Sequence, residues 1–234
     1  MGEHAWAAPG GLLERGLTEL GYEPSTHQLA QLARFIGEID LWNPRLKLVG
    51  ASGDELIVRH VLDSVSGPPA IRRYEVSGRV PRSAQPAWPQ AARVADVGSG
   101  AGFPGIPLAI MEPDSRFVLV ERSGRRAGFL RNAVAATRLP NAEVRECALE
   151  QYADTVDLAV FRAFLPLSPR LLVSLRRIVR DGGTIVAYKG RSSRIEAEIE
   201  GLRRSGAGGM LEPLIVPVDV PFLDEERHLL LVPA

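Results

Sequence analysis

A glycine-rich turn between a short apolar strand and a proline constrains the fold of this chain more than any other part of its sequence. Residues 93–97 end in Asp96-Val97, and Gly98-Ser-Gly100-Ala-Gly102 follows directly. Glycines permit a tight turn and let a ligand approach the backbone without meeting Cβ atoms. Pro104 suits the first turn of a helix, where its missing N–H would have no partner anyway. The segment predicts a strand–turn–helix unit of a nucleotide-binding α/β fold, with the ligand at the carboxyl end of the strand.

The spacing of the glycines separates this turn from two other phosphate-binding turns. A dinucleotide site has the pattern G-x-G-x-x-G/A, and the third small position counted from Gly98 is the bulky Phe103. Counting from Gly100 places Gly105 there but leaves Gly98 unexplained. A P-loop needs a lysine after its last glycine, and none follows here. Asp96 gives the acid-x-G-x-G-x-G form that is typical of S-adenosylmethionine-dependent methyltransferases, with an ordinary strand-to-helix turn as the alternative.

Two later segments agree with a cofactor site. Residues 117–120 are apolar and end in Glu121, and an acid at that strand end can accept hydrogen bonds from ribose hydroxyl groups. A surface acid would also explain Glu121. Leu149 and Glu150 follow the third expected strand, where Leu149 would lie against the adenine face and Glu150 near its edge.

An alternation of strands and helices begins at residue 93. The expected strands are 93–97, 116–121, 142–147, 157–161, 183–188, 211–219 and 227–232, and the expected helices are 104–112, 124–137, 167–180 and 192–205. This alternation predicts a doubly wound, mostly parallel seven-stranded sheet of the Rossmann-like α/β class, with helices on both faces. The last two strands have no helix between them, so they are expected to form a C-terminal antiparallel hairpin.

The first 70 residues are expected to form an N-terminal helical extension. Apolar residues recur at helical spacing over 29–41, and Asn43-Pro44 predicts the end of that helix. Ser52 with Glu55 is a capping-box pattern and predicts the start of a second helix. His60, Asp63 and Ser64 are spaced to share one face of it.

The proline content of residues 71–92 separates the N-terminal helices from the rest of the chain. Residues 71–92 are rich in proline and predict an irregular connection, and residues 93–234 are expected to form the cofactor-binding core. The chain has no signal-peptide pattern and no apolar run of the roughly 18 residues that span a bilayer. Cys147 is the only cysteine, which excludes an intramolecular disulfide and a cysteine-rich metal site. A cytoplasmic location without membrane association and without a metal is expected.

Charge is balanced overall but uneven along the chain. The 28 basic residues equal the 28 acidic residues, which at first argues against a nucleic-acid partner. Arginines nevertheless cluster near residues 122–131, 170–180 and 191–194. Such clusters could contact phosphates or could be solvated helix faces.

Several segments together resemble the glucose-inhibited division protein B family, bacterial methyltransferases that modify N7 of a guanine in small-subunit ribosomal RNA. The segments span residues 41–232 and include Arg59–Ser64 (RHVLDS), Asp96–Pro107 (DVGSGAGFPGIP), Arg162–Phe164, Tyr188–Gly190 and Glu226–Leu229 (ERHL). The resemblance implies a class I methyltransferase fold, S-adenosylmethionine as cofactor, and 16S ribosomal RNA or the small subunit as partner. The sequence does not give the oligomeric state, and a monomer is the favoured expectation. Glu121 departs from the family pattern, in which aspartate is usual.

The site residues follow from the turn and from this resemblance. Positions that match the family's cofactor site are Gly98, Phe103, Leu149, Glu150 and Arg162, to which the turn and the second strand add Asp96, Gly100, Gly102 and Glu121. Arg162 and Lys189 end the fourth and fifth strands and are the catalytic candidates. Arg162 could pair with a phosphate or the cofactor carboxylate, or form an internal salt bridge. The RNA-binding candidates are His60, Arg125, Arg126, Lys189 and Arg227.

Guanine N7 carries a free lone pair and no proton, so its methylation needs no general base. This agrees with the lack of a convincing catalytic dyad in the sequence. Three alternatives stay open at this point: a methyltransferase for a small molecule or protein, a non-catalytic ribosome-assembly binder, and, more distantly, a nicotinamide-dependent oxidoreductase.

Overall fold

A seven-stranded sheet in the order β3-β2-β1-β4-β5-β7-β6 forms the centre of the computed structural model, which describes residues 10–76, 88–163, 166–205 and 213–234. The strands are β1 (Arg93–Val97), β2 (Arg116–Val120), β3 (Ala142–Arg145), β4 (Val156–Arg162), β5 (Val179–Lys189), β6 (Leu214–Val218) and β7 (Arg227–Pro233). Strands β1 to β5 are parallel, and β7 runs antiparallel to both β5 and β6. The predicted doubly wound sheet with a C-terminal hairpin is confirmed.

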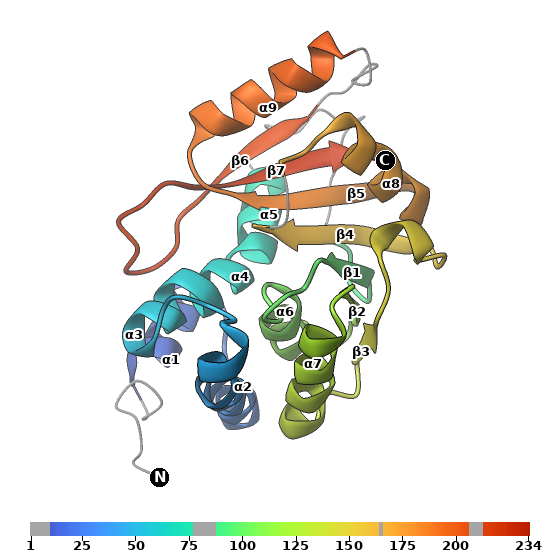
Figure 1. Ribbon diagram of the computed structural model, residues 1–234. Coiled ribbons are helices and arrows are strands. Elements are labelled where there is room, and N and C mark those ends of the chain that lie inside the picture. The colour runs from blue at the N-terminus through green and yellow to red at the C-terminus, as the bar shows by residue number, and fades with distance from the viewer. Residues whose placement is uncertain (1–9, 77–87, 164–165, 206–212) are drawn as a thin grey trace.

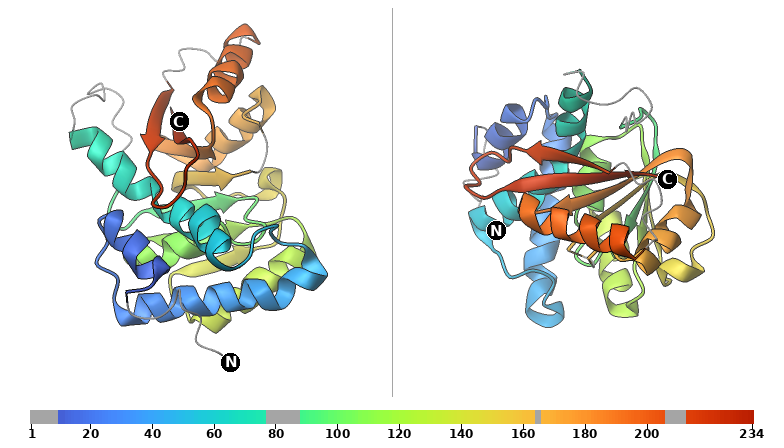
Figure 2. Two further views of the ribbon diagram at one scale, coloured as in Figure 1. Left: turned by 90° about the vertical axis from the view of Figure 1, so that its left-hand side faces the viewer. Right: turned by 90° about the horizontal axis from the view of Figure 1, so that it is seen from above.

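Alternate side chains of each strand enter two separate cores. On one face, residues such as Val94 and Val160 pack with α6 (Gly105–Met111) and α7 (Gly124–Thr137). On the other, Ala95 and Ala159 pack with α8 (Pro169–Ile178) and α9 (Ser192–Arg204). Figures 1 and 2 show helices on both sides of the sheet. The chain winds outward from β1 in both directions, so the carboxyl ends of β1 and β4 flank the switch point where such folds bind ligands.

The N-terminal helices share the first of these cores. Helix α1 (Leu12–Glu19) contributes Leu17, and α2 (Thr26–Leu46) contributes Phe35, both fully buried. Helix α2 packs along α7 and begins with a capping box between Ser25 and Gln28. The expected break at Asn43-Pro44 is wrong, because α2 continues to Leu46. Pro44 lies in its last turn, where the one carbonyl that it leaves without a helical partner belongs to the exposed Asp40.

The second predicted helix is present but not as a regular α-helix. It consists of α3 (Gly53–Leu56), a π-helical turn η2 (Ile57–Leu62) and α4 (Asp63–Val65), and it lies beside the carboxyl end of β4 (Figure 1). The expected capping box at Ser52 is wrong, because its side chain makes no capping hydrogen bond. The π-helical turn widens the spacing of the helical faces, so Ser64 is fully buried whereas His60 is partly exposed.

Helix α5 (Gly67–Val76) occupies part of the stretch expected to be irregular. Pro68 and Pro69 stand in its first turn, where their missing N–H groups cost no helical hydrogen bond. The irregular connection predicted for residues 71–92 is therefore wrong for residues 71–76. Residues 77–87 of that connection lie outside the described part of the chain.

Candidate active site

The glycine turn after β1 has left-handed backbone at each of its three glycines. The φ angles are 71° at Gly98, 54° at Gly100 and 87° at Gly102. The amide groups of Gly98 and Ser99 donate to the carbonyl of Val120 at 2.9 and 3.2 Å, which fixes the turn against the end of β2. A Cβ atom on Gly102 would lie 2.7 Å from Cδ1 of Ile106, so close packing against α6 adds to the conformational demand for glycine there.

Asp96 lies beneath the turn, away from the open site. It is fully buried, and its Oδ2 accepts a hydrogen bond from the Gly105 amide at 3.0 Å. Burial raises its pKa from 3.8 to about 7, partly offset by the Gly105 hydrogen bond. The structure therefore places this residue where it holds the start of α6 and not in the cavity lining.

Glu121 braces the turn from the end of β2. Its Oε2 accepts from the Gly100 amide at 2.9 Å, and its Oε1 accepts from the Ser123 amide at 2.8 Å. The side chain is almost fully buried, yet the residue lines the cavity over the turn. Each carboxylate oxygen has a second lone pair, so Glu121 can hold the turn and still accept from a ligand hydroxyl.

A cavity of about 660 Å³ opens over the glycine turn. It brings together most of the residues expected to bind the cofactor, namely Gly98, Gly100, Phe103, Glu121, Leu149, Glu150 and Arg162. Asp96 and Gly102 do not line it. Sequence reasoning missed Leu48 and Val49 after α2, and Ser168, Arg170 and Leu171 at the start of α8. No pattern in these segments pointed to the cavity, because only the fold brings them to it.

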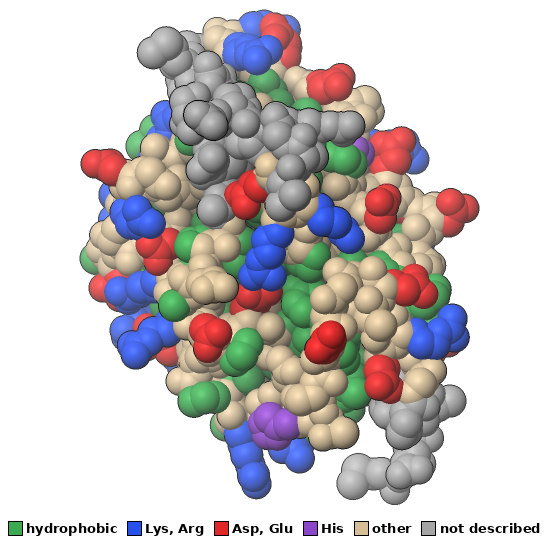
Figure 3. All heavy atoms as spheres, turned by 180° about the vertical axis from the view of Figure 1, so that it is seen from behind, with side chains coloured by type: hydrophobic (Ala, Val, Ile, Leu, Met, Phe, Trp, Pro, Cys, Tyr) green, Lys and Arg blue, Asp and Glu red, His purple; other side chains and the backbone are tan. Residues whose placement is uncertain are grey.

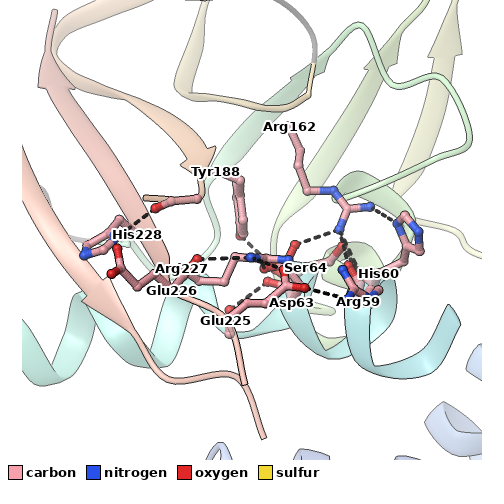
Figure 4. Close-up of polar contacts among 12 residues, drawn as sticks. Arg59, His60, Asp63, Ser64, Arg162, Tyr188, Glu225, Glu226, Arg227 and His228 are labelled. Carbon is pink, nitrogen blue, oxygen red and sulfur yellow. Dashed lines mark hydrogen bonds and ion pairs between the residues drawn. The ribbon is translucent and has the colours of Figure 1, made fainter. Parts of the chain in front are cut away.

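Arg162, at the end of β4, is held by the N-terminal helices (Figure 4). Its Nη1 donates to Oδ2 of Asp63 at 2.8 Å and to the carbonyl of Arg59 at 3.1 Å. Its Nη2 lies 2.8 Å from Nδ1 of His60, and its Cζ lies 5.0 Å from the centroid of the Phe103 ring. The guanidinium is thus fixed by an ion pair, a ring nitrogen and an aromatic face.

Asp63 joins Arg162 to the C-terminal hairpin. Its Oδ1 lies 3.3 Å from Nε of Arg227, the first residue of β7. Arg227 and Arg59 both pair with Glu225, at 3.0 and 2.5 Å, and these two hydrogen bonds lower the pKa of Glu225. The side chain of Asp63 is only 7% exposed. This buried carboxylate between two guanidinium groups connects the N-terminal helices, β4 and β7 at the end of the sheet where β4 ends.

A second cavity of about 510 Å³ lies on the other side of Arg162. It shares His60, Arg162 and Ala163 with the first cavity. Its basic side chains come from several elements: Arg59, His60, Arg162, Lys189, Arg191, Arg194 and Arg227. Nζ of Lys189 pairs with Glu198 at 2.7 Å. The sequence predicted His60, Lys189 and Arg227 here as RNA contacts and placed Arg191 and Arg194 in a cluster that could contact phosphates, but it did not single out Arg59.

The remaining RNA-binding candidates lie apart from this second cavity. Arg125 and Arg126 are exposed at the start of α7, and only Arg126 lines the first cavity. Phe164, the end of the Arg162–Phe164 segment, lies outside the described residues. On the face that Figure 3 shows, the acidic and basic side chains of the described residues are intermixed. No helix in the described ranges is long and apolar enough to cross a membrane.

Comparisons with known proteins agree with this architecture. The family model for the rRNA small subunit methyltransferase G matches residues 28–210. A Ribosomal RNA small subunit methyltransferase G of Methylococcus capsulatus is 35% identical over 221 residues, covering 93% of this chain and 95% of that protein. The protein of the same name from Treponema pallidum is 34% identical over 212 residues, covering 87% of this chain and 84% of that protein.

Among solved structures, an O-methyltransferase from Bacillus cereus in complex with SAH aligns over 95% of this chain and 97% of that one, with a TM-score of 0.56 and 12% identity. A SAM-dependent methyltransferase from Aquifex aeolicus has a TM-score of 0.50 at 17% identity, covering 73% of this chain and 95% of that one. These likenesses show the fold. The extent of the family match, together with the identity to its curated members, shows that this chain belongs to the rRNA small subunit methyltransferase G family.

Proposed function

We propose that this chain transfers a methyl group from S-adenosylmethionine to N7 of a guanine in 16S ribosomal RNA, as a monomer acting on the RNA or the small subunit. The observation that carries the proposal is the pair of adjoining cavities that share Arg162 and His60. One is built on a glycine turn and the other is lined by basic side chains. A cofactor in the first cavity and a polyanionic acceptor in the second can therefore approach each other at Arg162 and His60.

The first cavity fits S-adenosylmethionine, which supplies the reactive methyl group. Glu121 offers carboxylate oxygens for ribose hydroxyls, and Leu149 offers an apolar surface for the adenine. The open backbone of Gly98 and Gly100 leaves room beside the turn. The volume of about 660 Å³ lies in the range typical of small-molecule sites.

The second cavity fits an extruded nucleotide. Its lining includes Arg191 and Arg194, at the start of α9, and Arg227 from β7. Guanidinium groups bind phosphate oxygens in pairs of hydrogen bonds, which positions an RNA strand. Lys189, which also lines this second cavity, forms an ion pair with Glu198.

Positioning supplies the catalysis in this proposal. The displacement at the methyl carbon needs the attacking N7 and the departing sulfur in line, and orientation alone can contribute on the order of 7–11 kcal/mol. Arg162 is rigidly held between the cavities, so it fixes the wall across which the two substrates meet. N7 has no proton to lose, so no residue here needs to act as a general base.

The proposal is tested with methyl-labelled S-adenosylmethionine and small ribosomal subunits, or their RNA, from cells that lack this protein. We expect label to enter RNA at one site as 7-methylguanine. Gly98→Asp places a carboxylate in the cofactor cavity and should abolish transfer, whereas the matched Gly128→Asp change on the exposed face of α7 should not. Label in protein or in small molecules, or no transfer at all, would contradict the proposal.

A further inference from the structure

His60 lies in the wall between the two cavities and faces both of them. Its ring is 5.2 Å from the ring of Phe103, tilted by 32°, and its Nδ1 is 2.8 Å from Nη2 of Arg162. Figure 4 shows the imidazole held against the guanidinium at the end of β4. The ring is therefore fixed on one side while part of it remains accessible.

The contact with Arg162 determines the tautomer of His60. A guanidinium has five N–H donors and no acceptor, so Nδ1 must be the acceptor of this hydrogen bond. A neutral imidazole with an unprotonated Nδ1 carries its hydrogen on Nε2. Nε2 has no hydrogen-bond partner within the described ranges of the chain. His60 consequently offers one oriented N–H donor in the wall of the site.

The surroundings also keep this donor neutral. Burial, with the positive charges of Arg162, Arg59 and Arg227, lowers the pKa of His60 from 6.5 to about 4. Asp63 balances the charge of Arg162, and both lie within the same network. Methylation at N7 places a positive charge on the purine ring. A neutral donor can bind that base without repelling this charge, whereas an imidazolium would repel it.

We propose that the Nε2–H of His60 donates a hydrogen bond to O6 of the acceptor guanine and thereby selects guanine over adenine. The inference rests on the function proposed above, in which N7 is the nucleophile. O6 and N7 lie on the same edge of guanine, and both are acceptors. Because the N7 lone pair must face the methyl group, O6 is the atom on this edge that remains for a donor. Adenine presents an amino group at the O6 position, so two donors would meet there.

Two substitutions of His60 separate the role of its Nε2–H donor from the contact of its Nδ1 with Arg162. The His60→Asn side chain can keep a carbonyl oxygen near the place of Nδ1, facing Arg162, but has no donor at the place of Nε2. The His60→Gln side chain reaches the place of Nε2 with an amide N–H but loses the short contact to Arg162. His27→Asn, on the exposed start of α2, is the matched control for the same change elsewhere.

The experiment compares wild type, His60→Asn, His60→Gln and His27→Asn. The probes are small-subunit RNAs that carry guanine or 2-aminopurine, which lacks O6, at the nucleotide that wild type methylates. We expect wild type to lose roughly tenfold or more in kcat/KM on 2-aminopurine, whereas His60→Asn is already reduced on guanine and loses little more. His60→Gln should recover part of the sensitivity to O6. The intrinsic reactivity of the two bases cancels, because it is the same for every variant.

Three results would overturn the inference. The first is an equal loss on 2-aminopurine in wild type and His60→Asn. The second is a fall in S-adenosylhomocysteine affinity that accounts for the whole defect of His60→Asn, since this would assign His60 to the cofactor. The third is the absence of guanine methylation by wild type, which refutes the proposed function as well. The first two leave that function standing, so the failures are distinguishable.

Discussion

Asp96, beneath the glycine turn, carries a buried carboxyl group whose protonation affects the stability of the fold. Its carboxyl group is fully buried, and only Oδ2 has a hydrogen-bond partner in the described structure. Burial of a carboxylate favours the protonated form unless enough donors surround it. The pKa of about 7 in the folded protein, against 3.8 ordinarily, follows from this one-sided environment.

Stability should therefore depend on pH through Asp96. Since folding raises its pKa, its favourable contribution is complete below about pH 4 and is lost as the pH rises through 7. We expect the free energy of unfolding of wild type to fall relative to Asp96→Asn across this range, by up to roughly 4 kcal/mol. Urea unfolding at a series of pH values measures this difference, with Asp114→Asn at an exposed position as the control. A difference that is constant with pH would refute the assignment.

Sequence reasoning identified single site residues better than their partners. Glu121 and Phe103 could be predicted because each lies at a fixed distance from a recognisable turn. The ion pair of Arg162 with Asp63 joins residues 99 positions apart, and no local pattern encodes it. From the sequence, Arg162 could either form an internal salt bridge or contact a ligand. In the structure it forms the salt bridge with Asp63.

At the scale of single elements, local hydrogen bonding decided where helices begin. Ser25 caps the start of α2: its side chain accepts from the Gln28 amide, and the Gln28 side chain accepts from the Ser25 amide. Gln28 also donates to the carbonyl of Ile110 in α6 at 3.0 Å. The related capping-box pattern of Ser52 with Glu55 has no capping bond. A pattern over four residues cannot show which of two serines adopts the capping geometry.

These two serines give a matched pair of substitutions. Ser25→Ala removes an observed cap, so we expect the free energy of unfolding to fall by about 1 kcal/mol. Ser52→Ala removes no capping bond and should change it by less than about 0.5 kcal/mol. Chemical denaturation of both variants measures the contrast. Equal losses in the two proteins would show that the capping box of α2 contributes nothing specific.

The π-helical turn η2 explains why the site could not be built from helical spacing alone. His60 and Asp63 were expected on one regular face with Ser64, but the wider turn presents the first two to Arg162 and buries Ser64. There the carbonyl of Ser64 accepts from the hydroxyl of Tyr188 at 2.7 Å. The π-helical turn and the start of α4 directly after it thus link the N-terminal helices to both β4 and β5.

For the whole molecule, the sheet could be predicted because its strands are short, apolar and separated by helices or by a single loop. That pattern fixes the order of elements and places their carboxyl ends at one edge. The N-terminal helices could be recognised as helices, but their packing into the same core as the sheet depends on contacts far apart in sequence. The two cavities form where these parts meet, so they appear only in the folded chain.

The position at which the methyl group enters the RNA shows whether this chain modifies N7 of one guanine. Small-subunit RNA from cells lacking this protein would be treated with the purified chain and S-adenosylmethionine, then reduced with borohydride and exposed to aniline, which cleaves RNA at 7-methylguanosine. We expect strand cleavage at one guanine, and no cleavage there without the cofactor or with Gly98→Asp. Methylated RNA that resists cleavage, or cleavage at many guanines, would contradict transfer to N7 of a single selected base.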